Sequence, residues 1–150
     1  MGTLSTILLA AQHRAREQNL PYKGLLFPEE AYDILRSAPG ARLVDVRSRA
    51  EIDWVGFVPG AVRIEWLTYP GMKPNPQFLA ELEQQVDGEA LIMFLCRSGS
   101  RSHHAAIAAT QAGYADCYNV LQGFEGDLDA HKRRNTVGGW RQAGLPWEQT

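Results

Sequence analysis

Short apolar runs alternate along the chain with longer segments whose apolar residues recur at helical spacing. The short runs predict strands, because each is rich in apolar or β-branched residues and is bounded by polar or turn residues. The five predicted strands are residues 25–27, 41–46, 61–64, 90–95 and 116–120. Strands that alternate with helices over this length predict an α/β fold with a largely parallel sheet.

Helix signals fill the intervals between these strands. Pro28 and the two glutamates after it open one helix, since proline fits the first helical position and acidic side chains favour the N-terminus. Ser48 and Glu51 have the spacing of a capping box, and Asn75 and Pro76 are expected to supply the cap and first residue of another helix. The predicted helices are residues 3–19, 29–37, 49–54, 76–86 and 102–112.

Residues 4–11 are the most apolar segment near the N-terminus. No basic residue precedes them and no cleavage-site pattern follows, so a signal peptide is not expected. Apolar residues there recur at helical spacing and predict one face of an amphipathic helix, namely Leu4, Leu8, Ala11 and Ala15. We expect residues 1–23 to be a helical extension that packs on the domain or pairs two subunits as a homodimer.

The composition is that of an ordinary globular protein, with 45% hydrophobic and 21% charged residues. A chain of 150 residues is long enough for one domain, which we place at residues 24–150 with a polar insertion near 127–139. A net charge of −2 gives no reason to expect nucleic acid or an anionic membrane as partner. No apolar run approaches the roughly 20 residues that span a bilayer, and we expect a cytoplasmic protein.

The candidate chemistry lies in the loop that follows the strand at 90–95. Its residues are Cys96, Arg97, Ser98, Gly99, Ser100 and Arg101. A buried strand, a loop with a thiol at its start and a following helix place a thiolate beside an anion site, because loop N–H groups and a helix N-terminus favour negative charge. Ligands of parallel sheets bind outside the carboxyl ends of the strands, where Cys96 lies. Cys96 is therefore the predicted nucleophile.

Charged residues in and near this loop are candidates for substrate binding or support. Arg101 closes the loop and is expected to point inward toward an anion, whereas Arg97 faces either the anion or a partner surface. Asp45 and Arg47 stand at the end of the second predicted strand. They either support the loop or form a structural ion pair or cap, for example between Arg47 and Glu51.

Other residues that could carry chemistry have simpler interpretations. Cys117 begins an apolar strand and is expected to be a buried core thiol rather than a resolving cysteine. His103 and His104 lack convincing metal-ligand spacing with the cysteines, and neither a metal nor a cofactor is expected. Trp66 and Tyr69 are candidates for the wall of the active-site mouth.

Five segments, in order, resemble signatures of the rhodanese family of sulfurtransferases over residues 24–147. They are Leu43–Arg47, Val58–Ala61, Cys96–Arg101, Gly123–Gly126 and Ala143–Pro146. The chain departs from the family at Phe57, where a histidine is common. The resemblance implies a single three-layer α/β/α domain with a mainly parallel sheet of about five strands.

The resemblance also implies a thiosulfate sulfurtransferase. In such an enzyme, a donor such as thiosulfate would give its sulfane sulfur to Cys96, which would form a persulfide. A thiophilic small molecule or a sulfur-acceptor protein then takes the sulfur from it. The loop residues 97–101 would hold the anionic donor.

Two alternatives remain open. Cysteine phosphatases and arsenate reductases use a Cys-x5-Arg loop, whereas only four residues separate Cys96 from Arg101 here and Ser102 stands one step further. The smaller loop fits a terminal sulfur better than a phosphoryl group. The other alternative is a non-catalytic rhodanese-like binding or regulatory module, although such modules usually lack the cysteine.

Overall fold

In the computed structural model, which describes residues 2–150, five strands form one parallel sheet. In spatial order they are β1 (Gly24–Leu26), β7 (Cys117–Val120), β6 (Ile92–Leu95), β2 (Arg42–Asp45) and β3 (Val62–Arg63). Every residue of β6 and β7 is buried, as expected for central strands with helices on both faces. All five predicted strands are confirmed.

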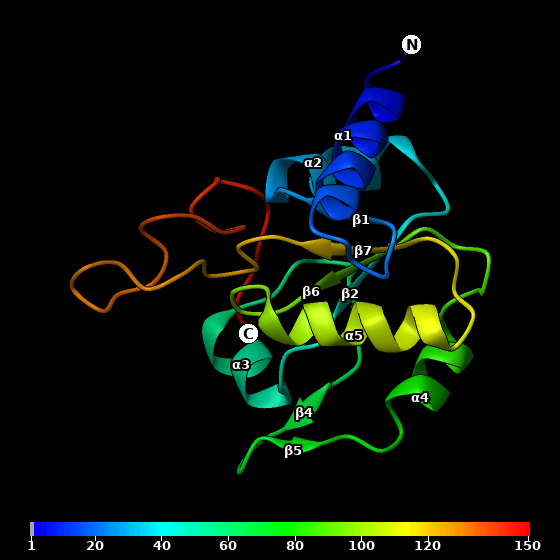
Figure 1. The fold of residues 1–150 in the computed structure, drawn as a ribbon. Helices are drawn as coiled ribbons and strands as arrows, with labels where there is room; N and C mark the ends of the chain where they lie inside the picture. Colours follow the sequence, from blue (N-terminus) through cyan, green and yellow to red (C-terminus); the bar gives the residue numbers. More distant parts are fainter. Residues whose placement is uncertain (1) are drawn as a thin grey trace.

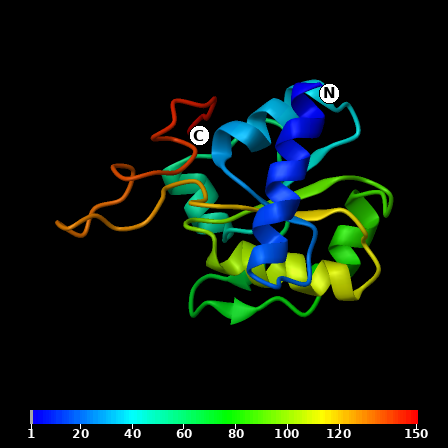
Figure 2. The same cartoon turned by 45° about the horizontal axis from the view of Figure 1, so that its top comes forward.

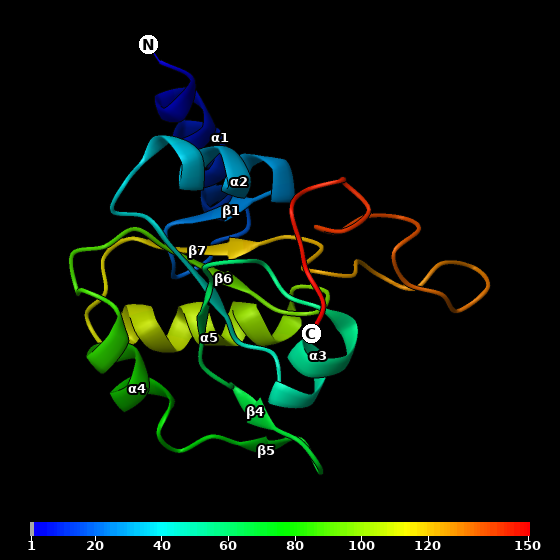
Figure 3. The same ribbon diagram turned by 180° about the vertical axis from the view of Figure 1, so that it is seen from behind.

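Helices cover both faces of this sheet (Figures 1 and 3). On one face lie α1 (Thr3–Glu17) and α2 (Pro28–Ser37), and on the other lie α4 (Phe78–Gln85) and α5 (Ser100–Gln111). The short helix α3 (Arg49–Val55) follows β2 at the carboxyl edge of the sheet. The expected three-layer α/β fold is confirmed.

The alternation of side chains along β6 divides the apolar core into two layers. Ile92 and Phe94 belong to the layer beneath α4 and α5, whereas Met93 and Leu95 belong to the layer beneath α1 and α2. Successive strand residues point to opposite faces, and Cys96 continues the alternation into the α4–α5 layer. The strand pattern therefore decides on which side of the sheet the thiol lies.

The helix α4 begins later than its cap signal predicts. Its first residue is Phe78 and its N-cap is Gln77, so the prediction that Pro76 opens the helix is wrong. The side chain of Asn75 instead accepts from the Gln77 N–H at 3.0 Å and donates to the Glu65 carbonyl at 2.8 Å. Asn75 therefore forms an Asx turn just before α4. Its amide group joins this turn to the preceding loop through the Glu65 carbonyl.

A small antiparallel hairpin occupies a segment predicted as loop. It pairs β4 (Leu67–Thr68) with β5 (Lys73–Pro74). The strands have only two residues each and one contains proline, so the pattern carries no strand signal. The hairpin tip exposes Tyr69 and Met72.

The polar stretch at 127–139 forms no helix and extends away from the body of the domain as a loop (Figures 1 and 2). Its base is fixed by the Asn135 N–H, which donates to the Glu125 carbonyl at 2.7 Å. Asp129 organises the loop itself, since its carboxylate accepts from the backbone of His131 and the hydroxyl of Thr136 at 2.8 Å each.

The helix α1 packs on its own domain (Figure 2). Ala11 and Ala15 are buried, and the Arg14 guanidinium donates two hydrogen bonds to the Glu30 carboxylate of α2 at 2.7 and 3.0 Å. Packing within the chain is confirmed, while pairing of two subunits through α1 stays a prediction. Within residues 2–150, no helix combines the length and the apolar character needed to cross a membrane.

We predict that Gly24→Ala destabilises the protein. A Cβ at Gly24 would lie 2.7 Å from the Tyr118 ring and 2.9 Å from the backbone of Ala11, so the packing of α1 on β1 must shift. Overpacking of this kind costs about 1–3 kcal/mol of unfolding free energy, which urea denaturation measures. Gly40→Ala is the matched control because nothing lies within 4 Å of its added Cβ. Equal losses in the two variants would contradict the packing argument.

Candidate active site

The loop between β6 and α5 surrounds the sulfur of Cys96. Gly99 is the N-cap of α5 and has φ +112°, a left-handed conformation that glycine adopts without steric cost. Its N–H donates to Cys96 Sγ at 3.1 Å. This amide and the N-terminus of α5 place partial positive charge beside the sulfur. The arrangement can hold a negatively charged sulfur or an oxyanion.

A buried polar network supports the other side of the thiol. Ser102 Oγ lies 3.2 Å from Cys96 Sγ and donates to Asn119 Oδ1 at 2.6 Å. The Asn119 amide in turn donates to the Gly99 carbonyl at 3.1 Å. Neither Ser102 nor Asn119 was a candidate from the sequence. The signal that could have found Asn119 is a polar residue in the middle of an otherwise apolar central strand, since a buried amide needs partners.

The segment after β7 holds the loop backbone. The N–H groups of Phe124 and Glu125 donate to the carbonyls of Cys96 and Arg97 at 2.8 and 3.0 Å. Gly123, with φ +63°, lets this close approach occur, because a Cβ there would lie 2.5 Å from the Cys96 carbonyl oxygen. Backbone far along the sequence thus fixes the position of the thiol-bearing residue.

Asp45 and Arg47 form a buried ion pair behind this segment. Their side chains are 1% and 0% exposed, and the Arg47 guanidinium donates to the Asp45 carboxylate with a shortest distance of 2.7 Å. The guanidinium also donates to the Gly56 carbonyl at 2.8 Å and lies 4.2 Å above the centre of the Phe124 ring. The pair therefore acts on the loop through Phe124 and makes no hydrogen bond to Cys96.

Arg101 pairs with Glu51, the N3 residue of the capping box of α3. Its guanidinium donates to both oxygens of Glu51 at 2.7 and 2.8 Å, so the suggested pairing of Arg47 with Glu51 is wrong. The predicted capping box is present, and Glu51 also accepts from the Ser48 N–H at 3.1 Å. Burial alone would raise the pKa of the Glu51 carboxyl, but hydrogen bonds and charge from Arg101, with hydrogen bonds from Ser48, lower it from 4.5 to about 2.

A cavity of about 410 Å³ opens beside the loop, between α3 and the tip of the hairpin. Arg97 and Arg101 line it, together with Tyr69, one of the two residues expected at the mouth. Trp66 does not line it, since its ring packs edge-on against Phe78 at 4.9 Å between centres. The thiol lies below the surface of the loop, because Cys96 is only 1% exposed and is not a lining residue of the cavity.

The remaining loop residues contribute backbone rather than buried side chains. Ser98 is half-buried and Ser100 is exposed. Within residues 2–150 neither hydroxyl has a hydrogen-bond partner.

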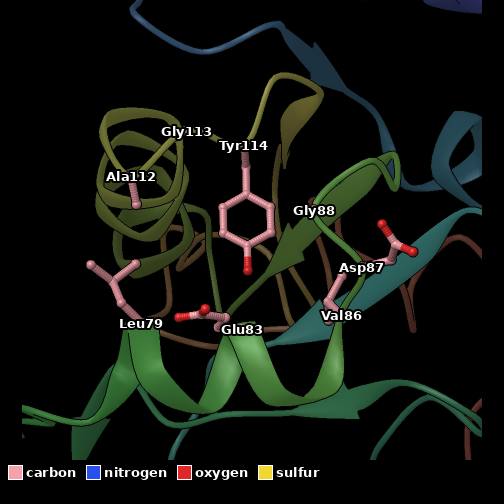
Figure 4. Close-up of a pocket in the computed structure, with 8 residues that line it drawn as sticks. All are labelled: Leu79, Glu83, Val86, Asp87, Gly88, Ala112, Gly113 and Tyr114. Carbon is pink, nitrogen blue, oxygen red and sulfur yellow. The ribbon is translucent and has the colours of Figure 1, made fainter.

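A second cavity, of about 420 Å³, lies at the opposite, amino edge of the sheet (Figure 4). Tyr114, Glu83 and Asp87 are among its lining residues. Burial and the nearby carboxylate of Glu83 raise the pKa of Tyr114. This cavity offers negative charge and no thiol, so it is not the site of the chemistry expected at Cys96.

Cys117 lies too far away to act with Cys96. Cys117 pairs with Ile92 of the neighbouring strand, and Ile92 is four residues before Cys96. At about 3.3 Å per residue, the Cα atoms of Cys96 and Cys117 are therefore roughly 13 Å apart. A disulfide needs about 4.4–6.8 Å. Both thiols are free and buried, and burial raises the pKa of Cys117 to about 11. Cys117 is a core thiol.

Comparison with known proteins identifies the family to which this chain belongs. A family model described as a rhodanese-like domain matches residues 27–130. The chain belongs to the rhodanese-like domain family. The crystal structure of Rv0390 from M. tuberculosis is similar, with 44% identity and a TM-score of 0.80 over 86% of this chain and 99% of that chain.

Curated relatives of this rhodanese-like chain include proteins with and without a named activity. An uncharacterized protein of Rickettsia conorii is 39% identical over 125 residues, covering 79% of this chain and 92% of the relative. The chloroplastic thiosulfate sulfurtransferase 16 of Arabidopsis thaliana is 27% identical over 118 residues, covering 77% and 85%.

Phe57, the departure from the family pattern, serves the scaffold of this rhodanese-like domain. Its backbone exchanges hydrogen bonds with Glu148 at 2.8 and 2.9 Å, and the Arg63 guanidinium lies 4.4 Å from its ring centre. The last residues of the chain thereby return to α3 (Figure 1), where the Thr150 hydroxyl donates to the Asp53 carbonyl at 2.9 Å. Phe57 makes no contact of this kind with the Cys96 loop.

We predict that Gly123→Ala destabilises the protein by about 2 kcal/mol or more, because the added Cβ would overlap backbone that cannot move without displacing the loop. The control is Gly144→Ala. Gly144 also has positive φ, +78°, but nothing lies within 4 Å of its added Cβ. Urea denaturation of both variants separates the steric contribution from backbone strain. A similar loss in both would show that the contact with the Cys96 carbonyl is unimportant.

We predict a pH-dependent contribution from the Glu51–Arg101 pair. The folded pKa of Glu51 lies below its ordinary 4.5, so the ionised pair stabilises the fold fully above that pH and loses its effect as pH falls toward 2. Glu51→Gln keeps the capping pattern but should be less stable than wild type near neutral pH, by an amount that shrinks in acid. Urea titrations at about pH 7 and about pH 3 measure the two differences.

The control for this pH prediction is Glu89→Gln, which changes an exposed carboxylate that makes no ion pair within residues 2–150. It should leave the free energy of unfolding nearly unchanged at both pH values. A Glu51→Gln difference that stays constant from neutral to acid pH would contradict the role of the pair.

Proposed function

We propose that the chain is a sulfurtransferase that carries a sulfane sulfur on Cys96. The observation that supports this most directly is the Gly99 N–H, which donates to Cys96 Sγ at 3.1 Å. Arg97 and Arg101 of the same loop border an open cavity. Donors aimed at the sulfur stabilise the charge that a thiolate, and then a persulfide, would carry. Relatives named as thiosulfate sulfurtransferases, at 26–27% identity, point the same way.

The reaction proceeds in two nucleophilic displacements at sulfur. The Cys96 thiolate attacks the terminal sulfur of thiosulfate, and the sulfur–sulfur bond of the donor breaks as sulfite leaves with the electron pair. The product on the protein is the persulfide Cys96–S–S⁻. A nucleophilic acceptor, such as cyanide or a thiolate, then attacks the outer sulfur, and Cys96 leaves as the thiolate.

The surrounding groups divide the work of binding and positioning. Gly99 N–H faces the sulfur, and the N-terminus of α5 adds favourable potential for an anion. Arg97, exposed at the cavity, attracts the anionic donor. Arg101 shares its charge with Glu51 and holds α3 against the loop. The acceptor is a small thiophilic molecule or a sulfur-acceptor protein.

We predict that incubation with thiosulfate adds the mass of one sulfur atom to the protein, and that cyanide removes it. Intact-mass spectrometry measures both steps. Cys96→Ser should take up no sulfur, because the nucleophile is gone. Cys117→Ala is the matched control and should be modified like wild type, since its thiol is buried at the other end of the strands.

Sulfur uptake by Cys96→Ser would overturn the proposal. A lack of sulfur uptake by wild type and by every variant, tested with several donors, would overturn it too. The second of these outcomes would favour a non-catalytic binding module. Hydrolysis of an aryl phosphate by wild type but not by Cys96→Ser would instead favour a phosphatase.

A further inference from the structure

We infer that the cavity beside the Cys96 loop selects an organic sulfur donor with one negative charge and an apolar group, such as an aryl thiosulfonate, over inorganic thiosulfate. This inference rests on the proposed sulfurtransferase function and adds the class of donor to it. Two independent features of the cavity support it, the apolar wall and the balance of charge.

The wall of the cavity is made of large apolar side chains that the fold leaves uncovered. Trp54 of α3 is 74% exposed, and Tyr69 and Met72 of the hairpin tip are 57% and 40% exposed. They come from two separate elements and border one space of about 410 Å³. Covering such surface is favourable, because apolar area is removed from water. Thiosulfate has no apolar group that could use this wall, whereas an aryl ring has.

The net charge at the cavity balances a monoanion, whereas a dianion would keep one uncompensated negative charge whose desolvation is unfavourable. Its charged lining consists of Arg97, Arg101 and Glu51. Glu51 binds Arg101 through both carboxylate oxygens, at 2.7 and 2.8 Å, and offsets its charge. Arg97 makes no ion pair within residues 2–150 and is the cation left uncompensated in the lining. A dianion would also meet the repulsion of the Glu51 carboxylate, because charges a few ångströms apart interact appreciably even in a wet site.

The chemistry of the loading step is balanced with such a donor. The Cys96 thiolate attacks the terminal sulfur of R–SO₂–S⁻, a new sulfur–sulfur bond forms, and the donor's own sulfur–sulfur bond breaks. The sulfinate R–SO₂⁻ leaves with the electron pair. The protein product is the same persulfide, Cys96–S–S⁻, so no further oxidant or reductant is needed.

The test compares benzenethiosulfonate with thiosulfate as donors, with cyanide as acceptor. Wild type should have the higher kcat/KM for benzenethiosulfonate. Trp54→Ala should lower that value about tenfold, through lost apolar contact, and change the value for thiosulfate by less than about twofold. The control is Leu79→Ala, an exposed apolar residue that lines the cavity at the opposite edge of the sheet, which should change neither value.

The charge argument has its own variant. Glu51→Gln retains a side chain that can accept from the Ser48 N–H but releases the full charge of Arg101. It should raise kcat/KM for thiosulfate relative to benzenethiosulfonate by about fivefold, since a dianion gains twice as much as a monoanion from the freed charge.

The outcomes separate this inference from the proposed function. If both donors load Cys96 but wild type prefers thiosulfate, or if Trp54→Ala lowers both values equally, the donor class is wrong and the sulfurtransferase stands. If neither donor adds sulfur to Cys96 in the intact mass, the proposed function fails and the donor class fails with it.

Discussion

The site depends on two backbone hydrogen bonds, from the N–H groups of Phe124 and Glu125 to the carbonyls of Cys96 and Arg97. They turn these two carbonyls toward the segment after β7, away from the sulfur, which the Gly99 N–H faces. The approach is possible only because Gly123 has no Cβ. A loop that must present N–H groups to an anion needs its carbonyls satisfied elsewhere, since unpaired buried carbonyls are costly.

This arrangement is supported from behind by a charged pair with no direct part in the chemistry. Arg47 lies on the ring of Phe124 and is neutralised by Asp45. Breaking such a pair leaves an isolated charge in the core, which is strongly unfavourable. The pair thus links the carboxyl end of β2 to the segment after β7 that holds the loop backbone.

A second linkage connects the loop to the cavity wall. Glu51 caps α3 and at the same time binds Arg101, so the helix that presents Trp54 is fastened to the loop that presents Arg97. One carboxylate thereby sets both the orientation of an apolar wall and the charge that remains for a ligand. A capping residue has become part of the electrostatics of the site because α3 is short and begins directly beside the loop.

Much was predictable from the chain alone. Short apolar runs identified the five strands, and helical spacing with cap signals identified the flanking helices. The position of Cys96 after a buried strand identified the thiol, because all these signals are local or repeat within a few residues. The β4–β5 hairpin, the entry of α4 and the partner of Glu51 were not predictable. Asn75 donates to the Glu65 carbonyl, and Glu51 binds Arg101, which lies fifty positions away in the sequence. The sequence by itself determined the fold class and the candidate nucleophile, whereas the tertiary structure decided which arginine remains uncompensated and which apolar side chains border the cavity, since pairing and exposure depend on contacts between distant segments.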